Sequence, residues 1–165
     1  MNKLIIWCLP AFFLCLQFCH TSTKVAPSPN GIEYMPDYKN WQVINVEHRT
    51  DNKTMRIIYG NPIAVEAIRS KHTKPWPDGA VLAKAVYDAV VDTTGMYTPG
   101  KFQQVMFMVK DSREFMLTLG WGWARWKGAE LKPYGKNATF TNECTSCHLP
   151  QKDKDYVFTE ATLIF

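Results

Sequence analysis

The chain has 165 residues, enough for one domain with a substantial buried core. Its hydrophobic share of 46% and charged share of 21% are ordinary for a globular protein. The net charge of +4 is spread along the chain without a run of Lys and Arg, which argues against a nucleic-acid-binding protein and against a membrane-surface patch.

The first 22 residues have the pattern of a signal peptide. Lys3 precedes an apolar run over residues 4–18, which is too short to cross a hydrocarbon core of about 30 Å. No small-x-small pattern marks the cleavage point, which we expect within residues 21–23, and an uncleaved N-terminal anchor is the alternative. The segment predicts export to the periplasm, with residues 23–40 as an irregular lead-in and residues 41–165 as one domain.

The first half of this domain is expected to contain a β-hairpin and a short helix. Residues 41–49 and 54–59 alternate as strands do, and residues 50–53 are typical of a turn. Asn61 can cap a helix over residues 63–71, with Pro62 in its first turn. A rigid, proline-containing loop follows at residues 74–79.

The second half is expected to supply the rest of a sheet. Residues 80–91 are ambiguous, because their alanines favour a helix while their alternation allows a strand. After a loop at 94–100, residues 101–110 and 120–126 predict strands, separated by a helical turn at 112–117. Residues 128–141 indicate a loop, and a turn or short helix begins near Asn142. The fold class is therefore α+β, with a predominantly antiparallel sheet and a few short helices.

The motif Cys-Thr-Ser-Cys-His at residues 144–148 is the pattern to which haem c is covalently attached. Cys144 and Cys147 are the only cysteines outside the predicted leader. Two thiols at this spacing can each form a thioether to a haem vinyl group. His148 would then lie beneath the iron as its axial ligand. One covalently attached haem c is the expected cofactor.

Three other uses of a Cys-x-x-Cys pair remain open from the residues alone. A zinc site would need two more ligands, which His48, His72 or acidic residues could supply, although no second paired motif exists. A thioredoxin-like redox pair is expected between a strand and a helix. A disulfide between Cys144 and Cys147 would be strained.

Several stretches together resemble the cytochrome P-460 family, which also contains the cytochromes c′-beta. The resemblance spans about Asp37 to Thr159 and is carried by DGAVLAK at 78–84, FMVK at 107–110, GWGW at 120–123, the haem motif and DYVFT at 155–159. It implies an antiparallel sheet, so residues 80–91 are expected to form a strand. It also implies five-coordinate haem iron with His148 on one side and an open position on the other, usually in a homodimer.

The resemblance implies roles for two cationic residues. In the P-460 branch, which oxidises hydroxylamine, the lysine matching Lys84 is bonded to the porphyrin edge. Arg56 matches the distal arginine, whose guanidinium could hydrogen-bond a bound nitrogen oxide. Arg49 is the alternative candidate for this distal arginine. The residues alone equally allow Lys84 to face solvent or a haem propionate, and Arg56 to be a surface side chain.

The stretch after the motif departs from the P-460 branch, which has a distal carboxylate there. Residues 149–152 are Leu-Pro-Gln-Lys, and the nearest acid is Asp153. The c′-beta branch has an apolar distal side and no lysine bond, and it binds nitric oxide. The chain is therefore expected to be a periplasmic c-type cytochrome that oxidises hydroxylamine and passes electrons to a periplasmic partner, or alternatively one that only binds nitric oxide.

A plain electron-transfer cytochrome is the third alternative, and it needs a sixth iron ligand. The candidates are His48, His72, Met55, Met96, Met106, Met108 and Met116. The tryptophans at 121, 123 and 126 suit a strand that faces a haem, although core packing is the more general use of such residues. Arg125 could pair with a propionate or lie in solvent.

Overall fold

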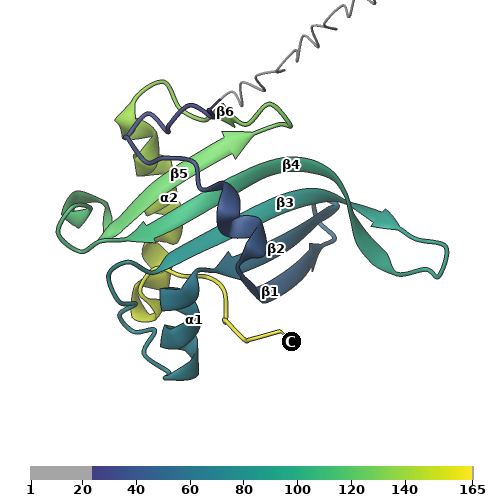
Figure 1. Ribbon diagram of the computed structural model, residues 1–165, viewed down its shortest axis with the longest axis horizontal. Coiled ribbons are helices and arrows are strands. Elements are labelled where there is room, and N and C mark those ends of the chain that lie inside the picture. The colour runs from purple at the N-terminus through teal and green to yellow at the C-terminus, as the bar shows by residue number, and fades with distance from the viewer. Residues whose placement is uncertain (1–23, 165) are drawn as a thin grey trace, which may run out of the picture.

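The computed structural model describes residues 24–164, in which a six-stranded antiparallel sheet follows chain order (Figure 1). The strands are β1 (Gln42–Arg49), β2 (Thr54–Gly60), β3 (Val81–Val91), β4 (Tyr97–Lys110), β5 (Trp121–Lys127) and β6 (Lys132–Pro133). The predicted antiparallel sheet is confirmed, including the strand at the ambiguous residues 80–91. The predicted leader lies outside the described residues.

Two α-helices are present within residues 24–164. Helix α1 (Pro62–Arg69) begins as the sequence predicts, because the Asn61 side chain accepts a hydrogen bond from Ala64 N at 2.9 Å. Helix α2 (Thr141–His148) contains the Cys-x-x-Cys-His motif and ends at its histidine. Short 3₁₀-helices are η1 (Pro36–Asn40), η2 (Met116–Thr118), η3 (Ala138–Phe140) and η4 (Leu149–Lys154), the last continuing directly from α2.

Three expected loop regions contain more structure than predicted. The lead-in forms η1, whose Tyr38 side chain is completely buried against the sheet. Strand β4 begins at Tyr97, because residues 97–99 pair with residues 89–91 and lengthen the β3–β4 hairpin. The stretch 128–141 contains β6 and η3. Each difference arises from long-range packing or pairing, which local sequence patterns do not report.

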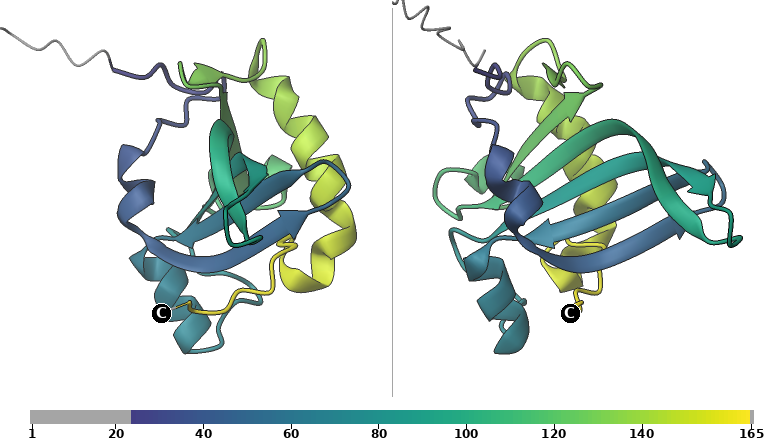
Figure 2. Two further views of the ribbon diagram at one scale, coloured as in Figure 1. Left: turned by 90° about the vertical axis from the view of Figure 1, so that its right-hand side faces the viewer. Right: turned by 45° about the vertical axis from the view of Figure 1, so that its right-hand side comes forward.

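The N-terminal segment covers one face of the sheet, while α2 lies over the other (Figure 2). Under the N-terminal segment, Tyr38, Phe107 and Trp126 form an aromatic core with ring centroids 5.5 to 5.6 Å apart. The Trp126 indole donates a hydrogen bond to the Ala26 carbonyl at 2.9 Å, which fixes the segment to β5.

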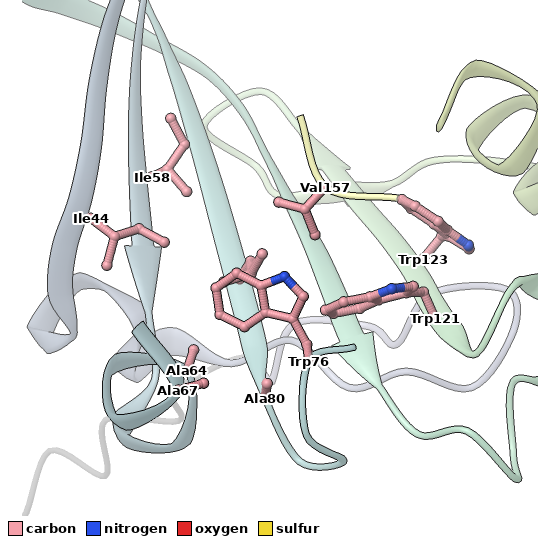
Figure 3. Close-up of a cluster of buried hydrophobic side chains, with 10 residues drawn as sticks. Ile44, Ile58, Ala64, Ala67, Trp76, Ala80, Trp121, Trp123 and Val157 are labelled. Atoms are coloured by element: carbon pink, nitrogen blue, oxygen red, sulfur yellow. The ribbon is translucent and has the colours of Figure 1, made fainter. Parts of the chain in front are cut away.

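A second core lies on the α2 side of the sheet (Figure 3). It brings side chains from β1, β2, β3, β5 and α1 together with the loop before β3 and the segment after η4. Its buried members are Ile44, Ile58, Ala64, Ala67, Trp76, Ala80, Leu82, Trp121, Trp123 and Val157. The C-terminal segment then runs beside β1, where Thr162 N donates to Ile44 O at 3.0 Å. No helix within residues 24–164 is both long and apolar enough to cross a bilayer.

Candidate functional site

His148 is held at the end of α2 by one hydrogen bond and two aromatic rings. Its Nδ1 lies 2.6 Å from the Tyr156 carbonyl oxygen. The Trp123 and Phe158 rings flank the imidazole, with centroids 4.5 and 4.8 Å away. Because a carbonyl can only accept a hydrogen bond, Nδ1 carries the proton and Nε2 keeps the lone pair needed by a metal.

The surroundings also favour the neutral imidazole. Burial lowers the pKa of His148, against the opposing effect of its hydrogen bond to Tyr156, and the positive charge of Lys84 lowers it further. A neutral histidine with a fixed tautomer and a free Nε2 is the form that ligates iron.

The two cysteines of α2 are unpaired thiols. Cys144 is half-buried and Cys147 is exposed. Burial raises the pKa of the Cys144 thiol, and the nearby Glu143 carboxylate raises it further. The Glu143 side chain is in turn held by the Tyr134 hydroxyl, which donates to Oε2 at 2.9 Å.

Strand register places Lys84 and Arg56 on the sheet face that α2 covers. Trp123, which contacts His148, pairs with Met108, and Met108 pairs with Leu82. Paired residues share a face and alternate residues along a strand return to it, so Lys84 lies on that face as well. Arg56 lies there too, because it pairs with Val86, two residues beyond Lys84.

Lys84 is half-buried, and charged groups of both the sheet and α2 affect its pKa. Burial lowers its pKa most, and the positive charge of Arg56 lowers it further, while Glu47 and Cys147 act in the opposite direction. Since Cys147 and His148 also interact electrostatically with Lys84, the structure brings the predicted lysine and the predicted haem motif together.

Arg56 is paired with Glu47, a residue that the sequence reasoning did not single out. Arg56 Nη1 donates to Glu47 Oε2 at 3.3 Å across the β1–β2 hairpin. Among residues 24–164, Arg56 Nε is buried and has no hydrogen-bond partner. A buried donor without a partner fits a site that receives an acceptor from a bound group. The opposite positions of Glu47 and Arg56 in a predicted hairpin could have identified the pair.

Most candidates for a sixth iron ligand lie away from this face. His48 and Met55 pair with each other on the opposite face, where the His48 ring stacks on Tyr97 with centroids 3.8 Å apart. Met96 and Met116 are 65% and 72% exposed. His72 is exposed in the loop after α1. The remaining candidates, Met106 and Met108, pair with Lys84 and Leu82 on the α2 side.

The other predicted residues divide between core and site. Trp121 and Trp126 are fully buried core residues, whereas Trp123 is buried against His148. Arg125 lies on the α2 side, where its Nε donates to Gln104 Oε1 at 2.7 Å and its guanidinium lies 4.5 Å from the Tyr134 ring centroid. Arg49 is bound to Asp51 at 2.6 Å at the end of β1.

The donor set fits haem better than zinc. Within the described part of the chain, no three His, Cys, Asp or Glu side chains are grouped as a metal-ion site requires. Cys144, Cys147 and His148 instead lie on one helix, with the histidine Nε2 free to bind. Lys84 and Arg56, both cationic, lie on the sheet face that α2 covers.

Comparison with known proteins agrees with this arrangement. No curated protein matches the chain. The model of the family described as Cytochrome P460 matches residues 35–159, which include the sheet, α2 and η4. The chain therefore belongs to the Cytochrome P460 family, a family of c-type haem proteins, which implies a haem cofactor.

Proposed function

We propose that this protein is exported to the periplasm, carries one covalently attached haem c and oxidises hydroxylamine at an open iron position. The observation that carries the proposal is the Arg56–Glu47 pair beside Lys84, on the sheet face that α2 covers. The signal-peptide pattern of residues 1–22 supports export, and the free thiols of Cys144 and Cys147 support covalent attachment.

The residues of α2 would hold the haem. Each thiol, from Cys144 and Cys147, would add its S–H across one vinyl double bond, which transfers no electrons. His148 would donate its Nε2 lone pair to the iron, while its Nδ1–H continues to donate a hydrogen bond to the Tyr156 carbonyl. When bound in this way, haem supplies an open coordination position and accepts the electrons of the substrate.

Arg56 and Glu47 would act on the substrate. Arg56 Nε, which is buried without a partner among the described residues, would donate a hydrogen bond to the hydroxylamine oxygen. Oxidising hydroxylamine removes protons as well as electrons, and the Glu47 carboxylate can accept a proton. This residue would replace the acid that is missing after His148. Electrons would leave to a periplasmic redox partner.

Lys84 would bond to the porphyrin edge, as its counterpart does in the P-460 branch. The lowered pKa supports this role, because the neutral amine has the lone pair that forms a bond to carbon. The new C–N bond would replace one N–H and one C–H bond, and a two-electron oxidant of the peroxide class would take up the two electrons while two protons are released. Bonding would also remove the cost of burying a charged ammonium beside Arg56.

An optical spectrum and a peptide mass map of the purified haem protein test the proposal. We expect a Soret band displaced far to the red, one fragment that joins the Lys84 peptide to the haem peptide, and hydroxylamine-dependent reduction of an added electron acceptor. A protein with separate peptides, an ordinary c-type spectrum and no turnover would contradict hydroxylamine oxidation.

Nitric oxide binding without turnover is the second candidate. It is favoured by the buried apolar side chains of Ile58 and Val86, which flank Lys84 and Arg56, and by the absence of an acid at residues 149–152. This candidate predicts an ordinary c-type spectrum, five-coordinate ferrous iron and a stable nitric oxide complex. A six-coordinate iron bound by Met106 would instead identify an electron carrier.

We also propose that the protein is a homodimer. The tip of the β3–β4 hairpin projects from the body of the molecule (Figure 1). At this tip the apolar side chains of Val91, Met96 and Tyr97 are exposed. We expect sedimentation at the mass of a dimer, and a lower dimer fraction after Val91→Lys with Met96→Lys. The exposed substitution Lys101→Met on the same strand should leave the dimer fraction unchanged.

A further inference from the structure

A buried ion pair joins the end of β4 to the segment that follows α2 and η4. Lys110 Nζ lies 2.8 Å from Asp155 Oδ2 and 3.0 Å from Oδ1. The two side chains are only 7% and 10% exposed, so this pair differs from the exposed ion pairs elsewhere on the surface. Burying both charges is costly, and such a pair is weak evidence for a role in stability alone.

Asp155 is fixed by several groups at once. Its Oδ2 accepts a hydrogen bond from Trp76 N at 2.9 Å, and its carbonyl accepts one from the Trp121 indole at 2.9 Å. Lys110 Nζ also lies 4.9 Å from the centroid of the Trp121 ring. The carboxylate therefore connects the end of β4, the loop before β3 and the segment after η4.

The backbone at this point has an uncommon shape. Asp155 and Tyr156 have φ values of +47° and +66°, two consecutive residues in the left-handed region. This conformation is unfavourable for residues other than glycine, so surrounding contacts must hold the turn. The contacts of Asp155 supply this restraint.

The left-handed turn places the Tyr156 carbonyl beside the His148 imidazole. Tyr156 O, directly after Asp155, accepts the Nδ1 proton of His148 at 2.6 Å. A strong hydrogen bond at Nδ1 orients the ring and makes Nε2 a better electron donor to a metal. The direction of this carbonyl is set by the turn that the Lys110–Asp155 pair holds.

We infer that Lys110 and Asp155 are positioning residues that set the donor strength of His148 toward the haem iron. Lys110 forms an ion pair with the Asp155 carboxylate, and the contacts of Asp155 fix the left-handed turn. The turn places Tyr156 O within hydrogen-bond distance of His148 Nδ1. The inference rests on the proposed role of His148 as the iron ligand.

The test compares the complete haem protein with Lys110→Met and Asp155→Asn variants. The readouts are the reduction potential and the iron–histidine stretching band of the ferrous protein in resonance Raman spectra. A weaker Nδ1 hydrogen bond lowers the electron donation of the imidazole. We therefore expect a higher potential and a downward shift of the band in both variants, with Lys110→Arg returning both toward the parent values.

Three further variants control for folding and for charge. The double variant Lys110→Met/Asp155→Leu replaces the pair by apolar side chains, which buried sites often tolerate, yet it still removes the anchor at Trp76 N. We expect it to show the same upward potential shift and downward band shift. The exposed pair Lys154–Glu160, at 3.0 Å in the same segment, gives the control variants Lys154→Met and Glu160→Gln, which should move neither readout.

The outcomes separate the two proposals. Haem-loaded variants with the parent's band and potential would overturn the positioning role. A parent protein whose ferrous haem is five-coordinate yet shows no iron–histidine band would instead overturn the ligand role of His148. If the single variants yield no folded protein, the double variant decides the question by the same two readouts.

Discussion

Lys84 shows at the scale of one residue how burial changes chemistry. Its side chain lies on a sheet face with Arg56, and burial together with that positive charge lowers its pKa. The unfolded chain has no such environment and keeps an ordinary lysine pKa of about 10.4. Between the folded and the unfolded pKa, the unfolded state therefore binds more protons, and the stability of the fold rises with pH.

The first prediction follows from this rise of stability with pH. In the haem-free variant Cys144→Ser/Cys147→Ser, the free energy of unfolding should rise with pH up to about 10.4, partly because of Lys84. Adding Lys84→Met should flatten this rise, since no titrating group remains at that position. Urea unfolding at several pH values measures the effect, with the exposed Lys101→Met as control. An unchanged slope in Lys84→Met would show that Lys84 is solvated.

The second prediction concerns Arg56. Arg56→Gln removes the buried Nε donor and the partner of Glu47, and a hydrogen bond to a charged group contributes about 1.5–3 kcal/mol. We expect kcat/KM for hydroxylamine to fall roughly 10- to 100-fold, since each 1.4 kcal/mol is a factor of ten.

Arg49 provides the matched control for Arg56. It lies in the adjoining strand β1, where its half-exposed guanidinium is bound to Asp51 at 2.6 Å and lies a longer 3.8 Å from Glu47 Oε1. Arg49→Gln should change kcat/KM by less than about twofold, as exposed pairs contribute little. Equal losses in the two variants would remove the specific role of Arg56.

At the scale of elements, β5 joins the two layers of the molecule. Trp121, Trp123 and Arg125 face α2 and the second core, while Gly122, Ala124 and Trp126 face the N-terminal segment. The small residues leave room for neighbours on that side. A Cβ at Gly122 would lie 2.5 Å from ring carbons of Phe115 and 2.8 Å from Ile32 Cδ1.

The third prediction follows from this close approach. Gly122→Ala should lower the free energy of unfolding by about 1–3 kcal/mol, because the ring of Phe115 must move. Denaturant unfolding followed by tryptophan fluorescence measures the loss. Lys127→Ala, at the exposed end of the same strand, should change stability by less than about 0.5 kcal/mol. A stable Gly122→Ala protein would mean that the layer adapts at no cost.

Sequence patterns predicted most elements because their causes are local. The capping of α1 by Asn61 and the β1–β2 hairpin needed only neighbouring residues. The local pattern of residues 80–91 does not distinguish a helix from a strand, because the strand depends on pairing with both β2 and β4. The burial of Tyr38 in the lead-in also depended on distant residues, so no local pattern marked it.

At the scale of the whole molecule, the proposed leader and the haem motif act together. Residues 1–22 would carry the chain to the compartment where haem c is attached, and Cys144 and Cys147 would then receive it. Without export, the Cys144 and Cys147 side chains of α2 would remain free thiols.

The fourth prediction tests this dependence. In a host that matures c-type cytochromes, the full chain should give a coloured periplasmic protein, while the chain without residues 1–22 should stay colourless. Haem staining of denaturing gels after fractionation measures covalent loading. An unrelated signal peptide fused before residue 23 should restore colour. Covalent haem on the leaderless protein would contradict the proposed route.

The sequence by itself determined the haem motif, the family and most strands, because each depends on residues that are close together in the chain. Only the tertiary structure decided that Glu47 pairs with Arg56, that Lys84 lies within range of His148, and that Tyr156 O accepts its Nδ1 proton. The Lys110–Asp155 pair joins residues 45 positions apart. Such pairings depend on the register of the sheet and on the packing of α2 over it, and neither leaves a local pattern in the sequence.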